Sequence, residues 1–307
     1  MSLPRWFAGA MPFVFVLLWS TGFIGAKFGL PYAAPFTFLL YRFLIVAAIL
    51  ALVAKITGAQ WPRDPRQILH IVVSGLMIHG VYLGGVFASI GAGLPSWLSS
   101  LICGLQPLLT GAVAGLVLGE HVRTRQWAGL LLGLVGVAIV LSEKALPSIG
   151  GHLEFGLDAL LLSVLALIGI TGGTLYQKRF STGMDLRTGS ALQFAASALA
   201  LLPLAWAEGF RADWSLEFSG AMAWLVLVLS IGAISLLMVM IRLGEASRVA
   251  SFFYLVPPVT AIEAHFLFGE TLGPLSLAGM AVVAVGVALV VARNATPAPT
   301  RDSPSGA

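Results

Sequence analysis

Ten apolar blocks of roughly 20 residues follow one another along this chain, and they limit its fold more than any other feature. A helix needs about 20 apolar residues to cross a hydrocarbon core of about 30 Å. Charged residues make up 10% of the chain, against about 25% in soluble domains. We therefore predict an all-α polytopic membrane protein. The ten predicted helices are 7–27, 35–55, 68–90, 96–118, 125–142, 156–177, 188–207, 221–243, 247–268 and 274–292.

One sequence pattern occurs twice, at an offset of 150 residues. It consists of a proline, then a Gly-Glu pair about a dozen residues later, then two further glycines. The first copy has Pro107, Gly119-Glu120, Gly129 and Gly136, and the second has Pro257, Gly269-Glu270, Gly279 and Gly286. Each copy belongs to a set of five helices, and five is odd, so the second set must cross the membrane in the opposite sense. Inverted repeats of this kind are typical of secondary transporters.

This repeat divides the chain. We predict a first five-helix repeat over 1–145, a second, inverted five-helix repeat over 146–293, and a disordered cytoplasmic tail over 294–307.

The basic residues are distributed unevenly between the predicted loops. With a cytoplasmic N-terminus, thirteen of the 17 Lys and Arg residues fall in cytoplasmic segments, three fall outside, and Arg42 falls within a helix. The positive-inside rule then predicts that both termini are cytoplasmic in a multi-pass protein of the cell inner membrane. The basic residues form no patch interleaved with aromatics, so no nucleic-acid partner is expected. We expect a monomer or a weak dimer with a small-molecule substrate.

Several of these features together resemble the drug/metabolite transporter superfamily, in its EamA-type branch. They are the ten spans in two inverted fives, Arg42-Phe43 in the second helix, and the doubled proline and Gly-Glu pattern, and the resemblance covers residues 8 to 292. Within this branch the sequence is most similar to bacterial aromatic amino acid exporters of the inner membrane. The resemblance implies export of small metabolites by alternating access, through a central cavity lined mainly by helices 1, 3, 4, 6, 8 and 9.

Polar and aromatic side chains near mid-membrane are the candidates for a substrate site, because a polar group in hydrocarbon is costly. A free amino acid needs hydrogen-bond partners for its ammonium and carboxylate, and an aromatic side chain needs apolar walls. The predicted substrate-binding residues are Trp19, His79, Tyr82, Gln106, Ser251 and Tyr254. The alternative is that His79 and Gln106 only hydrogen-bond neighbouring helices and that the aromatic residues only pack.

Prolines interrupt two helices at equivalent places in the two halves. Pro107 and the pair Pro257 and Pro258 remove backbone donors at mid-helix and let the helix bend. We predict that they are hinges for alternating access. A static kink that only shapes the bundle is the alternative.

Two charged residues, Arg42 and Glu263, fall at a similar depth inside the predicted helices. We predict that they form a buried charge pair or share a polar network. Alternatively, Arg42 extends outward to the membrane surface and Glu263 faces an external vestibule.

The leading functional prediction is a secondary transporter that exports amino acids, aromatic ones favoured, and related metabolites. Another neutral metabolite or an organic cation is the second candidate substrate, and a cation would require an accessible acid at mid-membrane. An intramembrane enzyme is a distant alternative, because no His pair, Ser/His pair or carboxylate pair shares a depth and a helix face. Neither a cofactor nor a metal is expected. The first helix carries no acidic residue, so both proton coupling and facilitated movement stay open.

Overall fold

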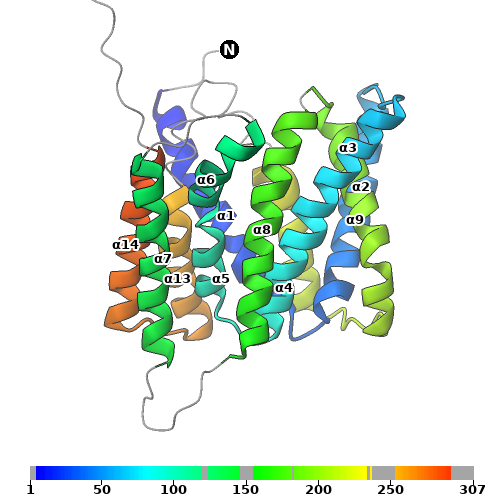
Figure 1. The fold of residues 1–307 in the computed structure, drawn as a ribbon. Coiled ribbons are helices and arrows are strands. Elements are labelled where there is room, and N and C mark those ends of the chain that lie inside the picture. Colours follow the sequence, from blue (N-terminus) through cyan, green and yellow to red (C-terminus); the bar gives the residue numbers. More distant parts are fainter. Residues whose placement is uncertain are drawn as a thin grey trace, which may run out of the picture.

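A computed structural model describes residues 5–118, 124–145, 155–181, 183–233, 236 and 253–291, and these residues form helices joined mostly by short turns (Figure 1). In the first half the elements are α1 (Arg5–Gly29), α2 (Pro35–Ile56), α3 (Pro65–Gly75), η1 (Leu76–Leu83), α4 (Gly84–Gly91), α5 (Ser96–Cys103), α6 (Gln106–Leu118) and α7 (Thr124–Ala145). In the second half they are α8 (Leu157–Phe180), α9 (Leu186–Ala207), α10 (Leu216–Ala223), η2 (Trp224–Ala233), η3 (Phe253–Leu255), α13 (Val256–Phe268) and α14 (Pro274–Val291).

These helices are those of a polytopic membrane protein. Within the described residues, seven helical spans are long and apolar enough to cross a bilayer, and α7 and α14 contain shorter apolar stretches. Large apolar side chains cover the outside of the bundle, with Leu131, Leu161, Leu199 and Phe266 more than half exposed. A surface of this kind fits lipid and would be unusual in water.

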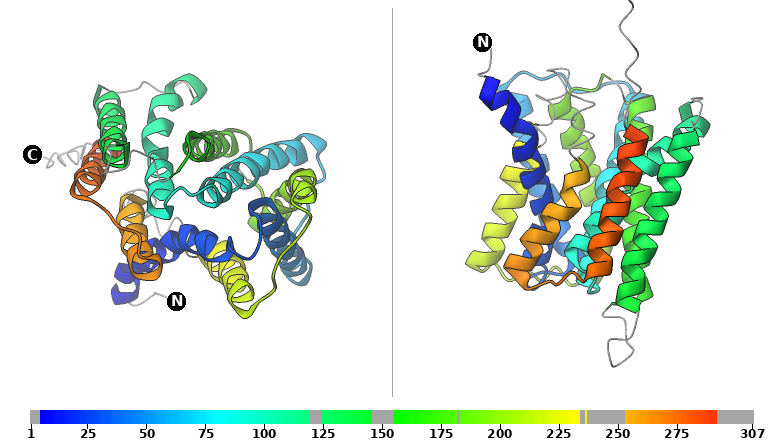
Figure 2. Two further views of the ribbon diagram at one scale, coloured as in Figure 1. Left: turned by 90° about the horizontal axis from the view of Figure 1, so that it is seen from below. Right: turned by 90° about the vertical axis from the view of Figure 1, so that its left-hand side faces the viewer.

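The two halves cross the molecule in opposite senses, as predicted. Figures 1 and 2 show that α1 begins and α14 ends at the same face, which we call the N-terminal face. The first-half helix α6 ends at this face, whereas its repeat equivalent α13 ends at the opposite face. The Gly119-Glu120 turn and the tail 294–307 lie outside the described residues.

Repeat-equivalent helices pack against each other across the interface between the halves. The glycines that the repeat singles out bring α7 and α14 close together: a Cβ on Gly136 would meet the Gly279 carbonyl oxygen at 2.7 Å, and one on Gly286 would meet the Gly129 oxygen at 2.7 Å. Small residues let membrane helices approach this closely. The repeat-equivalent helices α2 and α9 also pack together, so the repeat organises much of the bundle.

Four of the transmembrane spans are not continuous α-helices. In the third and eighth spans, the segments η1 and η2 are wound as π-helix. In the fourth span, α5 ends at Cys103 and α6 begins at Gln106, directly before Pro107. The ninth span contains the 3-10 turn η3, and α13 begins there with Pro257 and Pro258. Segments of π-helix are rare in proteins, and those that do occur are often found at functional sites.

Acidic side chains fix several helix ends. The Glu208 carboxylate accepts from the backbone N–H of Phe36 at 3.1 Å and of Thr37 at 2.6 Å, and so it satisfies free donors at the start of α2. A glycine ends α13: its C-cap residue Gly269 has the left-handed conformation, with φ of 67°. Glycine adopts this conformation without strain, which explains why the Gly-Glu pair terminates the helix.

Candidate functional site

A cavity of about 130 Å³ lies between the two halves. The first half contributes residues of α1, α2, η1 and α4, and the second half contributes residues of α8, α9 and η2. The lining residues are Trp19, Gly22, Phe23, Arg42, Ile78, His79, Tyr82, Leu83, Val86, Phe87, Ile170, Phe194, Leu229 and Ser230. The walls are therefore mainly apolar and aromatic, with a few polar groups, as in sites for small organic molecules.

Three predicted substrate-binding residues, Trp19, His79 and Tyr82, line this cavity. His79 is buried and stacks on Phe194 from the other half of the molecule, with ring centroids 4.0 Å apart. Its Nδ1 atom has no hydrogen-bond partner among the described residues. The π-helix η1 carries both His79 and Tyr82, so the irregular segment of the third span is the one that builds the site.

Trp19 connects the cavity to the broken ninth span. Its ring packs edge-to-face against Phe253 of η3, with centroids 5.3 Å apart. Phe15 contacts both rings, at 5.3 Å from Trp19 and 5.1 Å from Phe253. These three rings thus join η3 to a wall of the cavity.

Arg42 is the one formally charged residue among those that line the cavity. It is 3% exposed, and its Nη2 donates to the Ser230 hydroxyl at 3.0 Å. That hydroxyl donates in turn to the Leu225 carbonyl at 2.9 Å. Nε and Nη1 of Arg42 have no partner in the described part of the chain. Arg42 is therefore a buried cation in the cavity lining, beside the Phe87 ring at 6.0 Å, and most of its donors are unused among the described residues.

The predicted direct pair of Arg42 with Glu263 is not formed. Glu263 instead accepts from the Ser20 hydroxyl at 2.8 Å, while Arg42 bonds to Ser230. The reason is that α1 packs against α13 and brings Ser20 to the carboxylate. Depth in the membrane, which the sequence reveals, does not determine which helices are neighbours.

Gln106 does not line the cavity. It donates to the Thr174 hydroxyl of α8 at 3.2 Å, which is the interhelical role given above as its alternative. Ser251 lies outside the described residues, and Tyr254 lies in the turn η3. The resemblance also implied that helices 4 and 9 line the cavity. Instead, the second and seventh spans contribute lining residues beside those of the first, third, sixth and eighth.

The breaks at the prolines meet in the middle of the bundle. A Cβ on Gly104, in the turn between α5 and α6, would lie 3.1 Å from the Pro257 ring. Beside this contact the Thr260 hydroxyl donates to the Ser100 hydroxyl at 3.2 Å. The irregular segments of the fourth and ninth spans therefore cross each other.

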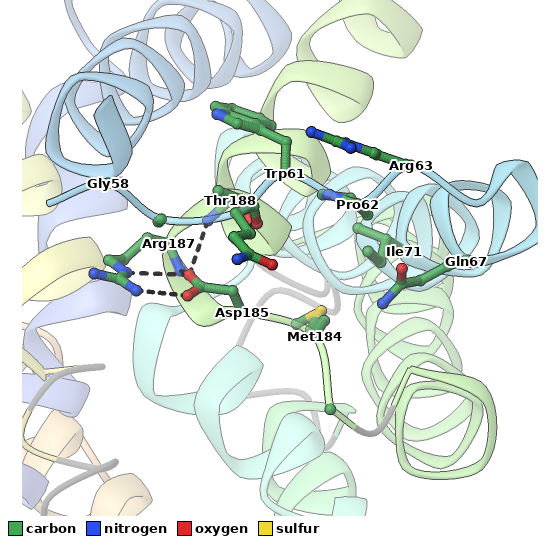
Figure 3. A pocket seen from close by; sticks show the side chains of 13 residues that line it. Gly58, Trp61, Pro62, Arg63, Gln67, Ile71, Met184, Asp185, Arg187 and Thr188 are labelled. Atoms are coloured by element: carbon green, nitrogen blue, oxygen red, sulfur yellow. Dashed lines mark hydrogen bonds and ion pairs between the residues drawn. The ribbon is translucent and has the colours of Figure 1, made fainter. Parts of the chain in front are cut away.

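A larger hollow, of about 950 Å³, lies at the N-terminal face (Figure 3). It lies between the segment that joins α2 to α3 and the start of α9, with Trp61 and Arg63 contributed by the first and Asp185 and Arg187 by the second. The Arg187 side chain donates to both oxygens of Asp185, at 3.1 and 2.6 Å. These hydrogen bonds lower the pKa of the Asp185 carboxyl to about 2. Because this hollow is an open depression at the surface, the smaller cavity is the candidate substrate site.

Sequence reasoning missed several lining residues, among them Phe87, Ile170, Phe194 and Leu229. The repeat offset could have found one of them, because Leu229 lies 150 residues after His79. The others are apolar residues in apolar helices, and only the packing of the helices distinguishes them from residues that face lipid.

Known proteins resemble this chain over most of its length. Residues 7–142 and 157–292 each match the EamA-like transporter family. The "uncharacterized transporter YvbV" of Bacillus subtilis is 28% identical over 94% of this chain and 93% of its own. A "probable amino-acid metabolite efflux pump" of Salmonella typhimurium is 26% identical over 91% of this chain and 93% of its own.

Two further comparisons agree with these. A "probable terminal-alkyne amino-acid exporter" of Streptantibioticus cattleyicolor is 30% identical over 91% of each chain. One solved structure, described only as the crystal structure of a protein, has a TM-score of 0.63 with this chain at 19% identity. It covers 93% of this chain and 96% of its own, which supports the fold.

Proposed function

The chain belongs to the EamA-like transporter family, and we propose that it is a secondary transporter that exports amino acids, aromatic ones favoured, and related metabolites by alternating access. The observation that carries this proposal is the cavity between the two inverted halves, with residues of both halves in its lining. In inverted-repeat transporters the substrate site lies at the interface between the repeats near mid-membrane. Two relatives named for the export of amino acids or their metabolites support the substrate class.

The charge of the cavity favours a zwitterionic substrate over an organic cation. Its lining residues include the cation Arg42, and none of them is Asp or Glu. A cationic substrate would enter beside a like charge, which is unfavourable at low dielectric. Another neutral metabolite is the remaining alternative.

The aromatic walls suit large apolar side chains, which can stack against Trp19, Phe87 or Phe194. The volume of about 130 Å³ is below the roughly 300–1,000 Å³ of sites for drug-sized ligands. An indole or phenyl side chain therefore requires lining side chains to move when it binds.

We also propose that both termini are cytoplasmic and that export runs toward the opposite face. Basic residues gather at the N-terminal face, as the positive-inside rule requires of a cytoplasmic side. The ones in the described helices and turns are Arg5, Lys55, Arg63, Arg66, Arg125, Lys178, Arg179 and Arg187, against Lys27, Lys144 and Arg211 at the opposite face.

The test is flux of radiolabelled L-phenylalanine, L-tryptophan, L-alanine and choline in proteoliposomes, with and without a pH gradient. We expect the purified protein to accelerate flux of the aromatic amino acids and not of choline. His79→Ala should lower the apparent affinity for L-phenylalanine by about tenfold, because it removes an aromatic wall and a polar atom. Leu199→Ala, at a residue that faces lipid, is the matched control. Choline flux without amino acid flux would contradict the proposal.

A further inference from the structure

We infer that Arg42 binds the carboxylate of the substrate, so that the transported compounds are carboxylates: amino acids, and analogues that keep the carboxylate but lack the ammonium. This inference rests on the proposed function and deepens it, because it names the chemical group by which the cavity selects its substrate.

Arg42 is one of the residues that line the cavity, and its guanidinium is only partly satisfied. Arg42 is almost fully buried, and one of its three nitrogens, Nη2, is engaged by Ser230. Nε and Nη1, which carry three of the five guanidinium N–H donors, have no partner among the described residues. Because the Ser230 hydroxyl donates to the Leu225 carbonyl, its lone pairs are free to accept from Arg42 and to orient the guanidinium.

A buried cation of this kind requires an anion. Burying a charge without a partner is strongly unfavourable, whereas a carboxylate in contact with arginine forms short, charge-assisted hydrogen bonds. The described lining of the cavity offers no acidic side chain, and Glu263 is held by Ser20 on another helix. A substrate carboxylate is therefore the anion that can neutralise Arg42 from the cavity side.

The remaining groups of an amino acid also find partners in the lining. His79 lines the cavity, and its buried Nδ1 has no partner among the described residues, so this atom can accept a hydrogen bond from the substrate ammonium when the lining side chains move to admit the substrate. The aromatic rings of Trp19, Phe87 and Phe194 surround the rest of the space. The carboxylate, the ammonium and the side chain of an amino acid substrate thus each have a partner of suitable chemistry in the lining: Arg42, His79 and the aromatic rings.

The experiment compares ligands that differ in one group, with purified full-length protein and equilibrium binding as the readout. The ligands are L-phenylalanine, 3-phenylpropionate, L-phenylalaninamide and phenethylamine. We expect the two carboxylates to bind about 10- to 100-fold more tightly than the amide and the amine, the range for hydrogen bonds to a charged group. In Arg42→Gln this preference should disappear. Arg42→Lys should keep part of it, because lysine preserves the charge without the planar donor group.

Arg66→Gln is the matched control, because it makes the same chemical change at an exposed position of α3. It should leave the preference unchanged. Equal binding of acid and amide by the wild type would overturn the inference, as would an unchanged preference in a folded Arg42→Gln. If Arg42→Gln does not fold, the ratio of the wild-type affinities for L-phenylalanine and L-phenylalaninamide tests the inference by itself. If amino acids are transported but acid and amide bind equally, this inference fails and the proposed function stands; if neither flux nor binding of amino acids is found, both fail.

Discussion

At the scale of single residues, we expect Leu229 to limit the size of the site. It lines the cavity from η2, and its side chain packs against Gly22 of α1, where a Cβ would meet it at 3.0 Å. It occupies the position that repeats His79 in the second half. The two halves therefore supply different chemistry at equivalent places, a polar ring in one and an aliphatic side chain in the other.

Leu229→Ala should enlarge the cavity and change its selectivity. We expect the ratio of apparent affinities for L-tryptophan and L-alanine to rise by roughly tenfold, since a few methylene groups change selectivity by 1–3 kcal/mol. Competition against L-phenylalanine flux measures the ratio. Leu227→Ala, on the same segment at an exposed residue, is the control. An equal change of the ratio in both variants would show that Leu229 does not determine size selectivity.

At the scale of the elements, we expect the molecule to bend at the breaks in the spans. The turn at Gly104 contacts Pro257, and Phe253 of η3 contacts Trp19 in the cavity wall. At the opposite face the Glu270 carboxylate pairs with Lys27 and accepts from the backbone N–H of Ser96 at 3.2 Å. These contacts tie α1, α5 and the turn after α13 together at that face.

Pro257→Ala tests whether the break in the ninth span is a hinge. Alanine can restore a backbone donor and straighten the helix. For a hinge we expect the rate of transport to fall by about tenfold or more while the affinity for L-phenylalanine changes little, because closing motions commonly limit turnover. Turnover and binding are measured separately on the same preparation. A static kink would instead give unchanged turnover, with at most a lower melting temperature.

Sequence reasoning predicted the elements better than it predicted the site. Apolar length and the repeat suffice to locate the helices and the opposite course of α6 and α13, because both follow from the thickness of the membrane and from an odd number of helices. The π-wound segments were not predicted, because a local change of winding leaves the apolar pattern intact. Neighbours across the bundle were predicted poorly as well: Glu263 bonds to Ser20 on α1, and Gln106 bonds to Thr174 on α8.

At the scale of the whole molecule, two oppositely threaded halves enclose one small cavity. Equivalent helices pack against each other, α7 with α14 and α2 with α9. Tryptophan side chains are exposed near both faces, with Trp61 and Trp127 at the N-terminal face and Trp206 and Trp214 at the opposite one, as in proteins that span a bilayer. In the transport cycle that we propose, the two halves exchange conformations and so open the cavity to each face in turn.

The most direct test of this account is the accessibility of the cavity from the two sides of the membrane. A cysteine at Leu229, in a protein with Cys103→Ser, is treated in oriented membranes with a thiol reagent that cannot cross the bilayer, applied to one face at a time. We predict labelling from both faces, a shift of their ratio on adding L-phenylalanine, and faster labelling from the opposite face in Glu270→Gln. Labelling from one face alone under every condition would contradict alternating access through this cavity.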